Sequence, residues 1–149
     1  MRFLNLFHFL MIATVVVAAS TRSSFAQDDR PHAVFVIGTE HYSPQRTMPG
    51  LAEQLEANFG FKITLIMPHE DPEKNEKGLP GLEILENADI AIFFMRFLTL
   101  PEDQLGYIER YLKSGKPVVG FRTSTHAFAY PSGHPLEKWN DGFGRDALG

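Results

Sequence analysis

The sequence predicts an α/β protein in which helices cover both faces of a parallel sheet. Four runs have the length and composition of strands: residues 33–37, 61–66, 89–95 and 117–121. Segments with apolar residues at helical spacing lie between them, so crossovers join strands that run in the same direction. The first and third runs are apolar almost throughout, which is typical of strands buried on both faces of a parallel sheet.

The first β-α-β unit spans residues 33–66. Its first strand ends at Gly38, where a polar loop follows. The expected helix begins at Thr47, a favourable N-cap residue, and ends before Gly60, which suits the left-handed backbone of a helix end. The apolar face of this helix contains residues three or four positions apart: Met48, Leu51, Leu55 and Phe59. Residues 61–66 alternate in polarity and form the second strand.

The next segment is a loop. Residues 67–80 are charged and punctuated by prolines, which indicates an exposed connection. A short helix around residues 82–85 then leads into the third strand. Thr99 and Glu102 match the capping-box pattern and predict the start of a second long helix, which Gly115 ends before the fourth strand.

The character of the chain changes after Phe128. Two runs rich in turn residues, 130–135 and 141–144, flank Trp139, the one large anchor between them. No further strand is expected there. Four strands are few for a sheet covered on both faces, so we expect residues 33–149 to be the front portion of a longer domain whose last strands are missing.

The N-terminus has the anatomy of a secretory signal peptide. Arg2 supplies a positive start, residues 3–19 are mostly apolar, and residues 24–26 offer small side chains around a cleavage site. A membrane anchor is the alternative, but the apolar run is short for a spanning helix and contains Asn5 and His8. We therefore expect residues 1–26 to be removed and the protein to be exported, periplasmic or extracellular, without stable insertion in a membrane.

Cleavage after Ala26 leaves a polar leader at residues 27–32 and a domain at residues 33–149. Arg2 and Arg22 leave with a signal that contains no acid, so 12 basic residues remain against 18 acidic ones and the formal charge changes from −4 to −6. Such a chain, without a basic stripe, disfavours nucleic-acid binding. The absence of cysteine excludes disulfides, thiolate metal ligands and a cysteine nucleophile.

Polar side chains follow three of the predicted strands. They are Glu40, His41, Tyr42, Arg96, Arg122, Thr123, Ser124 and His126. The carboxyl ends of parallel strands meet at one edge of the sheet, where open α/β sheets bind ligands. We expect Glu40 and His126 to be the proton-transfer candidates and the other six residues to contact the substrate.

Two of these residues have structural alternatives. A guanidinium at the end of an apolar strand is costly unless it is paired or solvated, so Arg122 either contacts a ligand or pairs with Glu40 and holds the loops. His126 either acts as an acid, base or ligand, or packs locally and caps the next helix. Thr123 and Ser124 are possible nucleophiles, but Arg122 occupies the centre of the G-x-S-x-G pattern that a nucleophile elbow requires.

No cofactor or metal motif is present. His41, His126 and Glu40 would make a set of two histidines and one carboxylate, but no HExxH or comparable spacing accompanies them. Gly38 is followed by no GxGxxG pattern, which disfavours a dinucleotide site. We expect no cofactor and no metal.

Several stretches together resemble the ThuA-like (trehalose-utilisation) family, whose domain is similar to class I glutamine amidotransferases. They are residues 38–42, 47–49, 88–90, 100–101 after Arg96, and 115–128. Together these stretches span about residues 33–148, and their order and spacing match the family. The resemblance implies a flavodoxin-like sheet, a role in carbohydrate metabolism and a small carbohydrate ligand. It also implies that Arg122 stands where an amidotransferase has its nucleophile, and without cysteine glutaminase chemistry is excluded.

Our first hypothesis is an exported ThuA-like domain that binds, and in a catalytic version transforms, a sugar or sugar derivative at the carboxyl edge of the sheet. The alternatives are a non-catalytic binding or interaction module and a metal-assisted hydrolase completed by a missing C-terminal segment. The lack of a recognised nucleophile leaves open whether the protein is an enzyme, and the sequence indicates no oligomeric state.

Overall fold

The computed structural model describes residues 28–68 and 78–149. Its sheet has four parallel strands in the order β2-β1-β3-β4: β1 (His32–Gly38), β2 (Lys62–Ile66), β3 (Ile90–Met95) and β4 (Val118–Gly120). The chain adds β2 on one side of β1 and then places β3 on the other. This strand order is flavodoxin-like, and the predicted α/β class with a doubly wound parallel sheet is confirmed.

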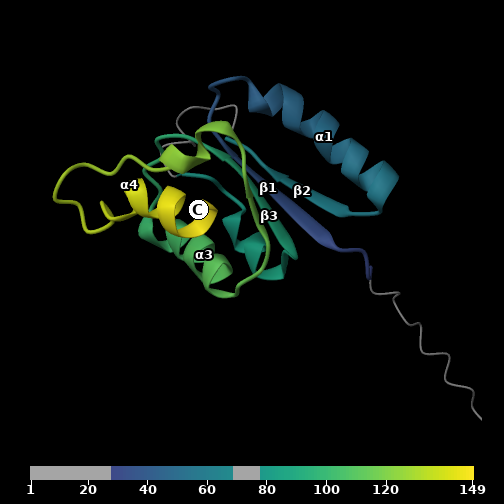
Figure 1. Ribbon diagram of the computed structural model, residues 1–149. Coiled ribbons are helices and arrows are strands. Elements are labelled where there is room, and N and C mark those ends of the chain that lie inside the picture. Colours follow the sequence, from purple (N-terminus) through teal and green to yellow (C-terminus); the bar gives the residue numbers. More distant parts are fainter. Residues whose placement is uncertain (1–27, 69–77) are drawn as a thin grey trace, which may run out of the picture.

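Helices cover both faces of this sheet (Figure 1). On one side lies α1 (Pro44–Phe59), and on the other lie η1 (Leu82–Asn87) and α3 (Glu102–Lys113). The side chains of β1 alternate between two buried clusters. Ala33, Phe35 and Ile37 pack with α1, whereas Val34 and Val36 pack with α3 and η1. Full burial of each large side chain stabilises the fold by about 1.5–3 kcal/mol, so this strand anchors both layers.

The first long helix starts earlier than its expected cap at Thr47. It begins at Pro44, and Ser43 occupies the N-cap position with a left-handed backbone and no side-chain cap. Proline suits the first helical turn because its φ is preset and its missing N–H has no partner there in any case. Thr47 lies one turn inside the helix, where its hydroxyl is 3.5 Å from the carbonyl oxygen of Ser43.

The expected capping box at Thr99 and Glu102 is not formed. Helix α3 begins at Glu102 with Pro101 before it and no side-chain cap. The Thr99 hydroxyl donates instead to the carbonyl oxygen of Ala129 at 3.2 Å. It thereby supports a parallel bridge between Leu98 and Phe128, an interaction between distant segments that local sequence does not reveal.

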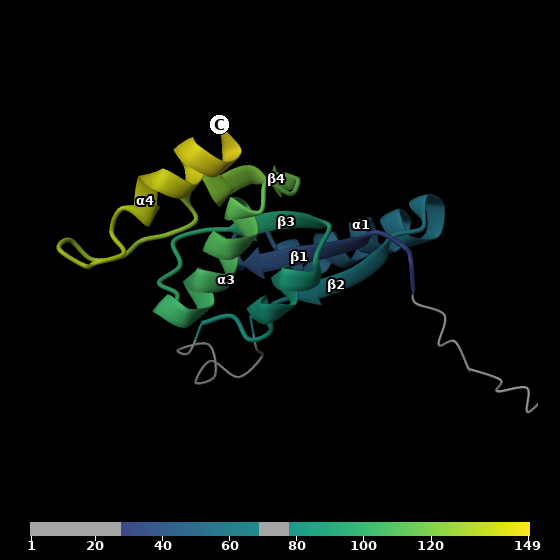
Figure 2. The same cartoon turned by 90° about the horizontal axis from the view of Figure 1, so that it is seen from below.

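The C-terminal residues form helical turns beside β4: η2 (Arg122–His126), α4 (Trp139–Gly142) and the π-helical η3 (Phe143–Leu148) (Figure 2). Phe143, inside the second of the two turn-rich runs, is a further anchor of this region. Phe143 is 1% exposed, and its ring meets the rings of Phe93 and Phe128 edge to face at 5.3 and 5.5 Å. As expected, no strand follows β4 in residues 121–149, all of which the structure describes, and these turns complete the core on the α3 side.

The described part of the chain starts at Asp28, within the segment expected to be a polar leader. His32, the last residue of the expected leader at residues 27–32, is buried as the first residue of β1, and its Nε2 atom is hydrogen-bonded to the Thr64 hydroxyl at 2.8 Å. The expected signal peptide at residues 1–26 and most of the expected loop at residues 67–80 lie outside the described residues. Within the described ranges, no helix has both the length and the apolar character that crossing a membrane requires.

Candidate functional site

Three strand ends meet at the carboxyl edge of the sheet. The loop after β1 is residues 39–43, the segment after β3 is residues 96–97, and the turn after β4 is residues 122–126. We call these three segments the strand-end cluster. The winding of the sheet reverses between β1 and β3, and the crevice at such a reversal is the usual ligand site of an open α/β sheet.

Unusual backbone conformations concentrate in this cluster. In the described ranges, the non-glycine residues with positive φ are Tyr42 (69°), Ser43 (53°), Phe97 (52°) and Arg122 (52°). A left-handed conformation costs an ordinary residue about 1–2 kcal/mol, and such strain persists only where surrounding structure enforces it. Every one of the three strand ends contributes at least one of these residues.

The first contact in the cluster joins the loop after β1 to the end of β4. The guanidinium carbon of Arg122 lies 4.3 Å from the centre of the Tyr42 ring. The ring of His41 meets that of Tyr42 edge to face at 4.3 Å. Tyr42 is 53% exposed, so this stack lies at the surface. Arg122 therefore packs on an aromatic ring rather than on Glu40, the pairing partner considered from sequence.

A second contact joins the ends of β3 and β4. The guanidinium carbon of Arg96 lies 4.3 Å from the centre of the Phe97 ring. Phe97 donates its backbone N–H to the carbonyl oxygen of His126 at 2.9 Å, and the two rings meet edge to face at 6.4 Å. The Nδ1 atom of His126 is hydrogen-bonded to the Thr125 hydroxyl at 2.9 Å, and the residue is exposed.

Ser124 does not face the surface of the cluster. It is 1% exposed, and its hydroxyl oxygen accepts the N–H of Met95 at 3.1 Å and lies 2.8 Å from the carbonyl oxygens of Phe93 and Phe121. The half-buried Thr123 likewise donates its hydroxyl to the carbonyl oxygen of Met95 at 3.2 Å. Both hydroxyls hold the turn after β4 against β3, so neither is presented as a nucleophile or as a free ligand donor.

Glu40 is exposed in the loop after β1. Its carbonyl oxygen accepts the N–H of Ser43 at 2.9 Å, which closes the turn before α1. Its carboxylate lies within 4.0 Å of no cationic group in the ranges 28–68 and 78–149. All eight predicted residues lie at one edge of the sheet, but they differ in exposure. Arg96 and Thr123 are half-buried, Ser124 is buried, and the other five are exposed.

Sequence reasoning missed Phe97 and Gln45. Phe97 is 52% exposed and contacts both Arg96 and His126, and its only sequence signal is an aromatic residue directly after the third strand. Gln45 lies in the first turn of α1, and its buried side-chain oxygen accepts no hydrogen bond from the described part of the chain.

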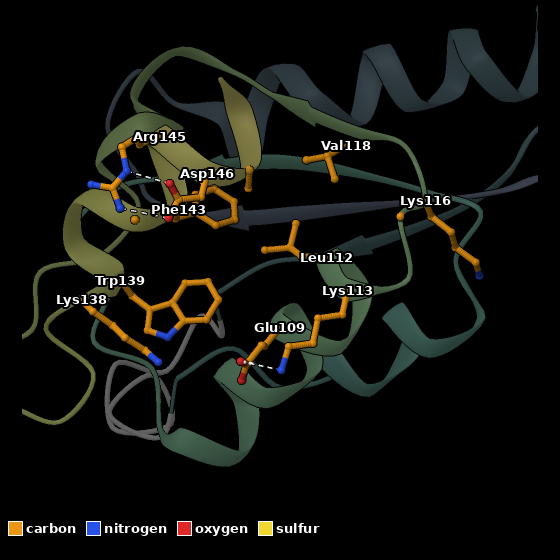
Figure 3. A pocket seen from close by; sticks show the side chains of 13 residues that line it. Glu109, Leu112, Lys113, Lys116, Val118, Lys138, Trp139, Phe143, Arg145 and Asp146 are labelled. Carbon is orange, nitrogen blue, oxygen red and sulfur yellow. Dashed lines mark hydrogen bonds and ion pairs between the residues drawn. The ribbon is translucent and has the colours of Figure 1, made fainter.

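A separate groove of about 670 Å³ lies between α3, β4 and the C-terminal turns (Figure 3). Apolar side chains line its interior: Leu112, Val118, Trp139 and Phe143. Two of its cations are paired with acids, Lys113 with Glu109 at 2.9 Å and Arg145 with Asp146 at 2.7 Å. Lys116 and Lys138 add further positive charge to its lining. No predicted site residue lines this groove, so its size alone does not make it the better candidate.

The donor set of the strand-end cluster does not suggest a metal. Among residues 28–68 and 78–149, no three histidine, aspartate or glutamate side chains are grouped so that they would hold an ion. The fold and the cluster together define a flavodoxin-like α/β domain with a polar, aromatic surface at its strand ends. Comparisons with protein-family models, curated proteins and solved structures found no match.

Proposed function

We propose that this chain is an exported ThuA-like domain that binds a sugar or sugar derivative at the strand-end cluster. The observation that carries the proposal is the concentration of left-handed residues at all three strand ends, because backbone strain of this kind clusters at ligand sites. The resemblance of the sequence to ThuA-like proteins supports the choice of a carbohydrate. Export follows from the signal-like anatomy of residues 1–26.

The chemistry of the cluster suits a polyol ligand. Tyr42 and Phe97 offer half-exposed aromatic faces and edges, which accommodate the apolar C–H faces of sugar rings. The guanidinium groups of Arg96 and Arg122 supply hydrogen-bond donors in a planar arrangement. Glu40 supplies an acceptor, so hydroxyl groups of the ligand find both kinds of partner.

In a catalytic version of this proposal, Glu40 and His126 carry the proton transfers. Glu40 is exposed without a described ion-pair partner, and His126 has one ring nitrogen engaged by Thr125. One ring nitrogen held by a hydroxyl orients the imidazole so that the other can exchange a proton with a ligand. Replacing Glu40 with Gln and His126 with Asn would then abolish turnover while leaving sugar binding within about threefold.

A non-catalytic binding module is the second candidate, and the burial of Ser124 favours it. The hydroxyls of Ser124 and Thr123 are both committed to the backbone of β3, so the turn after β4 presents no activated nucleophile. Product analysis after prolonged incubation with a bound sugar distinguishes the two candidates. Unchanged sugar at stoichiometric enzyme supports the binding module, and any released or rearranged product rejects it.

The test of binding is ligand-induced thermal stabilisation across neutral mono- and disaccharides, trehalose included. A sugar at 100 times its Kd stabilises the folded state by about 2.7 kcal/mol, which raises Tm by several degrees. Arg122→Ala should reduce this shift. The matched control is Arg110→Ala, because Arg110 also lies over an aromatic ring, Tyr107 at 4.6 Å, but on α3. An Arg122→Ala response equal to that of the wild type removes Arg122 from the site.

A further inference from the structure

Arginines in this structure fall into two groups by their partners. Three are paired with carboxylates: Arg30 with Asp28 at 2.9 Å, Arg110 with Glu86 at 3.1 Å, and Arg145 with Asp146 at 2.7 Å. The other three in the described ranges have no carboxylate within 4.0 Å: Arg46, Arg96 and Arg122. All three unpaired arginines follow the carboxyl ends of strands, two in the strand-end cluster and one in the first turn of α1.

This division does not come from a shortage of acids, because the chain carries 18 of them against 14 lysines and arginines. One exposed arginine without a partner would mean little, since surface ion pairs contribute little to stability. The concentration at one edge is the informative feature. Glu40 is the only acidic residue of the strand-end cluster, so the edge has an excess of positive charge on a protein that is negative overall.

The two cluster arginines are held in place by rings. Arg96 lies over Phe97 and Arg122 over Tyr42, each with its guanidinium carbon 4.3 Å from the ring centre. Stacking occupies one face of the planar guanidinium and leaves its N–H edges available. That planar fork matches the oxygens of a carboxylate or phosphate better than it matches a neutral hydroxyl.

The first turn of α1 also indicates that the ligand is negatively charged. The N-terminal end of a helix is electropositive and is usually accompanied by acidic side chains. Here the first turn contains no acid and no side-chain cap, and it carries Arg46. An arginine is unfavourable at this position unless negative charge comes from elsewhere, and the helix begins directly after the cluster's first loop.

We infer that the strand-end cluster recognises an acidic sugar derivative, with Arg96 and Arg122 binding a carboxylate or phosphate group of the ligand. This inference rests on the proposed function, because it names the ligand class of the same site. It assigns the neutral part of the ligand to the aromatic side chains and the acidic group to the arginines. The groove between α3 and β4 also carries positive charge, on Lys116 and Lys138, but its one arginine, Arg145, is paired with Asp146. It therefore offers no unpaired guanidinium.

Isothermal titration with four probes tests the inference: glucose, glucuronate, glucose 6-phosphate and inorganic phosphate. We expect at least one acidic sugar to bind about tenfold or more tightly than glucose, with an affinity that falls as salt rises. The glucuronate and glucose 6-phosphate arms show whether the acidic group is a carboxylate or a phosphate. Arg96→Ala and Arg122→Ala should each bring the acidic sugar to within about threefold of glucose, whereas Arg110→Ala should preserve the preference.

The outcomes separate this inference from the proposed function. Equal binding of glucose and both acidic sugars overturns the inference and leaves the sugar site standing. Binding of inorganic phosphate with no sugar bound, lost in Arg122→Ala, overturns the sugar site and leaves anion recognition. No binding of any probe overturns both. Arg122→Lys keeps the charge without the planar fork, and a full preference in this variant would also contradict the role given to the guanidinium. Circular dichroism of each variant checks that it folds.

Discussion

The guanidinium of Arg122 stacks on the ring of Tyr42, 4.3 Å from its centre, and so joins the end of β4 to the loop after β1. In the sheet, β3 lies between these two strands, so the contact passes over its end. Both residues have positive φ, 52° and 69°. An exposed cation–π contact contributes about 0.5–1 kcal/mol, which is less than the backbone strain at the two residues. The rest of the fold must therefore hold this arrangement.

Because of the backbone strain at Arg122, we predict that glycine gives a more stable protein than alanine at this position. Both substitutions remove the stack on Tyr42, but glycine adopts a left-handed backbone without the steric cost that alanine has. We expect Arg122→Gly to be more stable than Arg122→Ala by about 1 kcal/mol in urea unfolding. At Thr125, in the same turn but with ordinary φ, alanine should be the more stable of the two. Alanine more stable than glycine at both positions would contradict the left-handed conformation.

The buried hydroxyl of Ser124 predicts a large effect from a small change. Ser124→Ala leaves the N–H of Met95 without its acceptor, 3.1 Å away in the native protein, inside the core. An unsatisfied buried group costs about 1–3 kcal/mol, and we expect a loss of that size in the free energy of unfolding. The control is Ser114→Ala at the exposed end of α3, which should cost less than about 1 kcal/mol. Equal losses would mean that the Ser124 hydroxyl is not structural.

Two glycines predict opposite responses to alanine. A Cβ at Gly144 would lie 2.5 Å from the carbonyl oxygen of Thr125, and backbone cannot move as a side chain does. We expect Gly144→Ala to destabilise the protein by about 2 kcal/mol or more, because η3 is pushed away from η2. Gly50 lies inside α1 with open space around it, so Gly50→Ala should stabilise by about 0.5–1 kcal/mol. Melting temperatures of both variants check this, and a stabilised Gly144→Ala would disprove the close packing.

Tyr130 predicts a loss of stability at high pH. Burial raises the pKa of its phenol from 10 to about 12. Because the folded pKa exceeds the unfolded one, this stabilising contribution is complete below pH 10 and disappears as the pH rises from about 10 to 12, a loss on the order of 1–2 kcal/mol. Tyr130→Phe removes the hydrogen bond to the carbonyl oxygen of Leu100, 2.9 Å away, and costs about 1 kcal/mol at neutral pH.

The measurement for Tyr130 is urea unfolding at pH 8, 10 and 11 for the wild type and Tyr130→Phe. We expect the wild type to lose more stability than the variant over this range. Burial also raises the pKa of Tyr111, so the variant should retain part of the dependence. Parallel curves for the two proteins would show that the Tyr130 phenol titrates in the folded state as it does in the unfolded one.

The strands were predictable because burial on both faces requires continuous apolar runs, and such runs are visible in one dimension. Two helix starts were not. At Thr47 and Thr99, a favourable local cap was available, but the chain used Pro44 and Glu102 as the first helical residues. In both cases the loop before the helix follows the end of a strand, and contacts with other strand ends decided its conformation.

The candidate site likewise has features that the sequence predicted and features that it did not. Polar side chains such as Glu40 and Arg96 could be predicted at this edge from the sequence, because they follow buried strands and parallel strands present all their carboxyl ends at one edge. Three features could not be predicted before the chain was folded: Arg122 lies over Tyr42, Phe97 belongs to the cluster, and Ser124 is buried. The physical reason is that these contacts join segments far apart in the chain, and each depends on backbone conformations that only the packed sheet edge enforces.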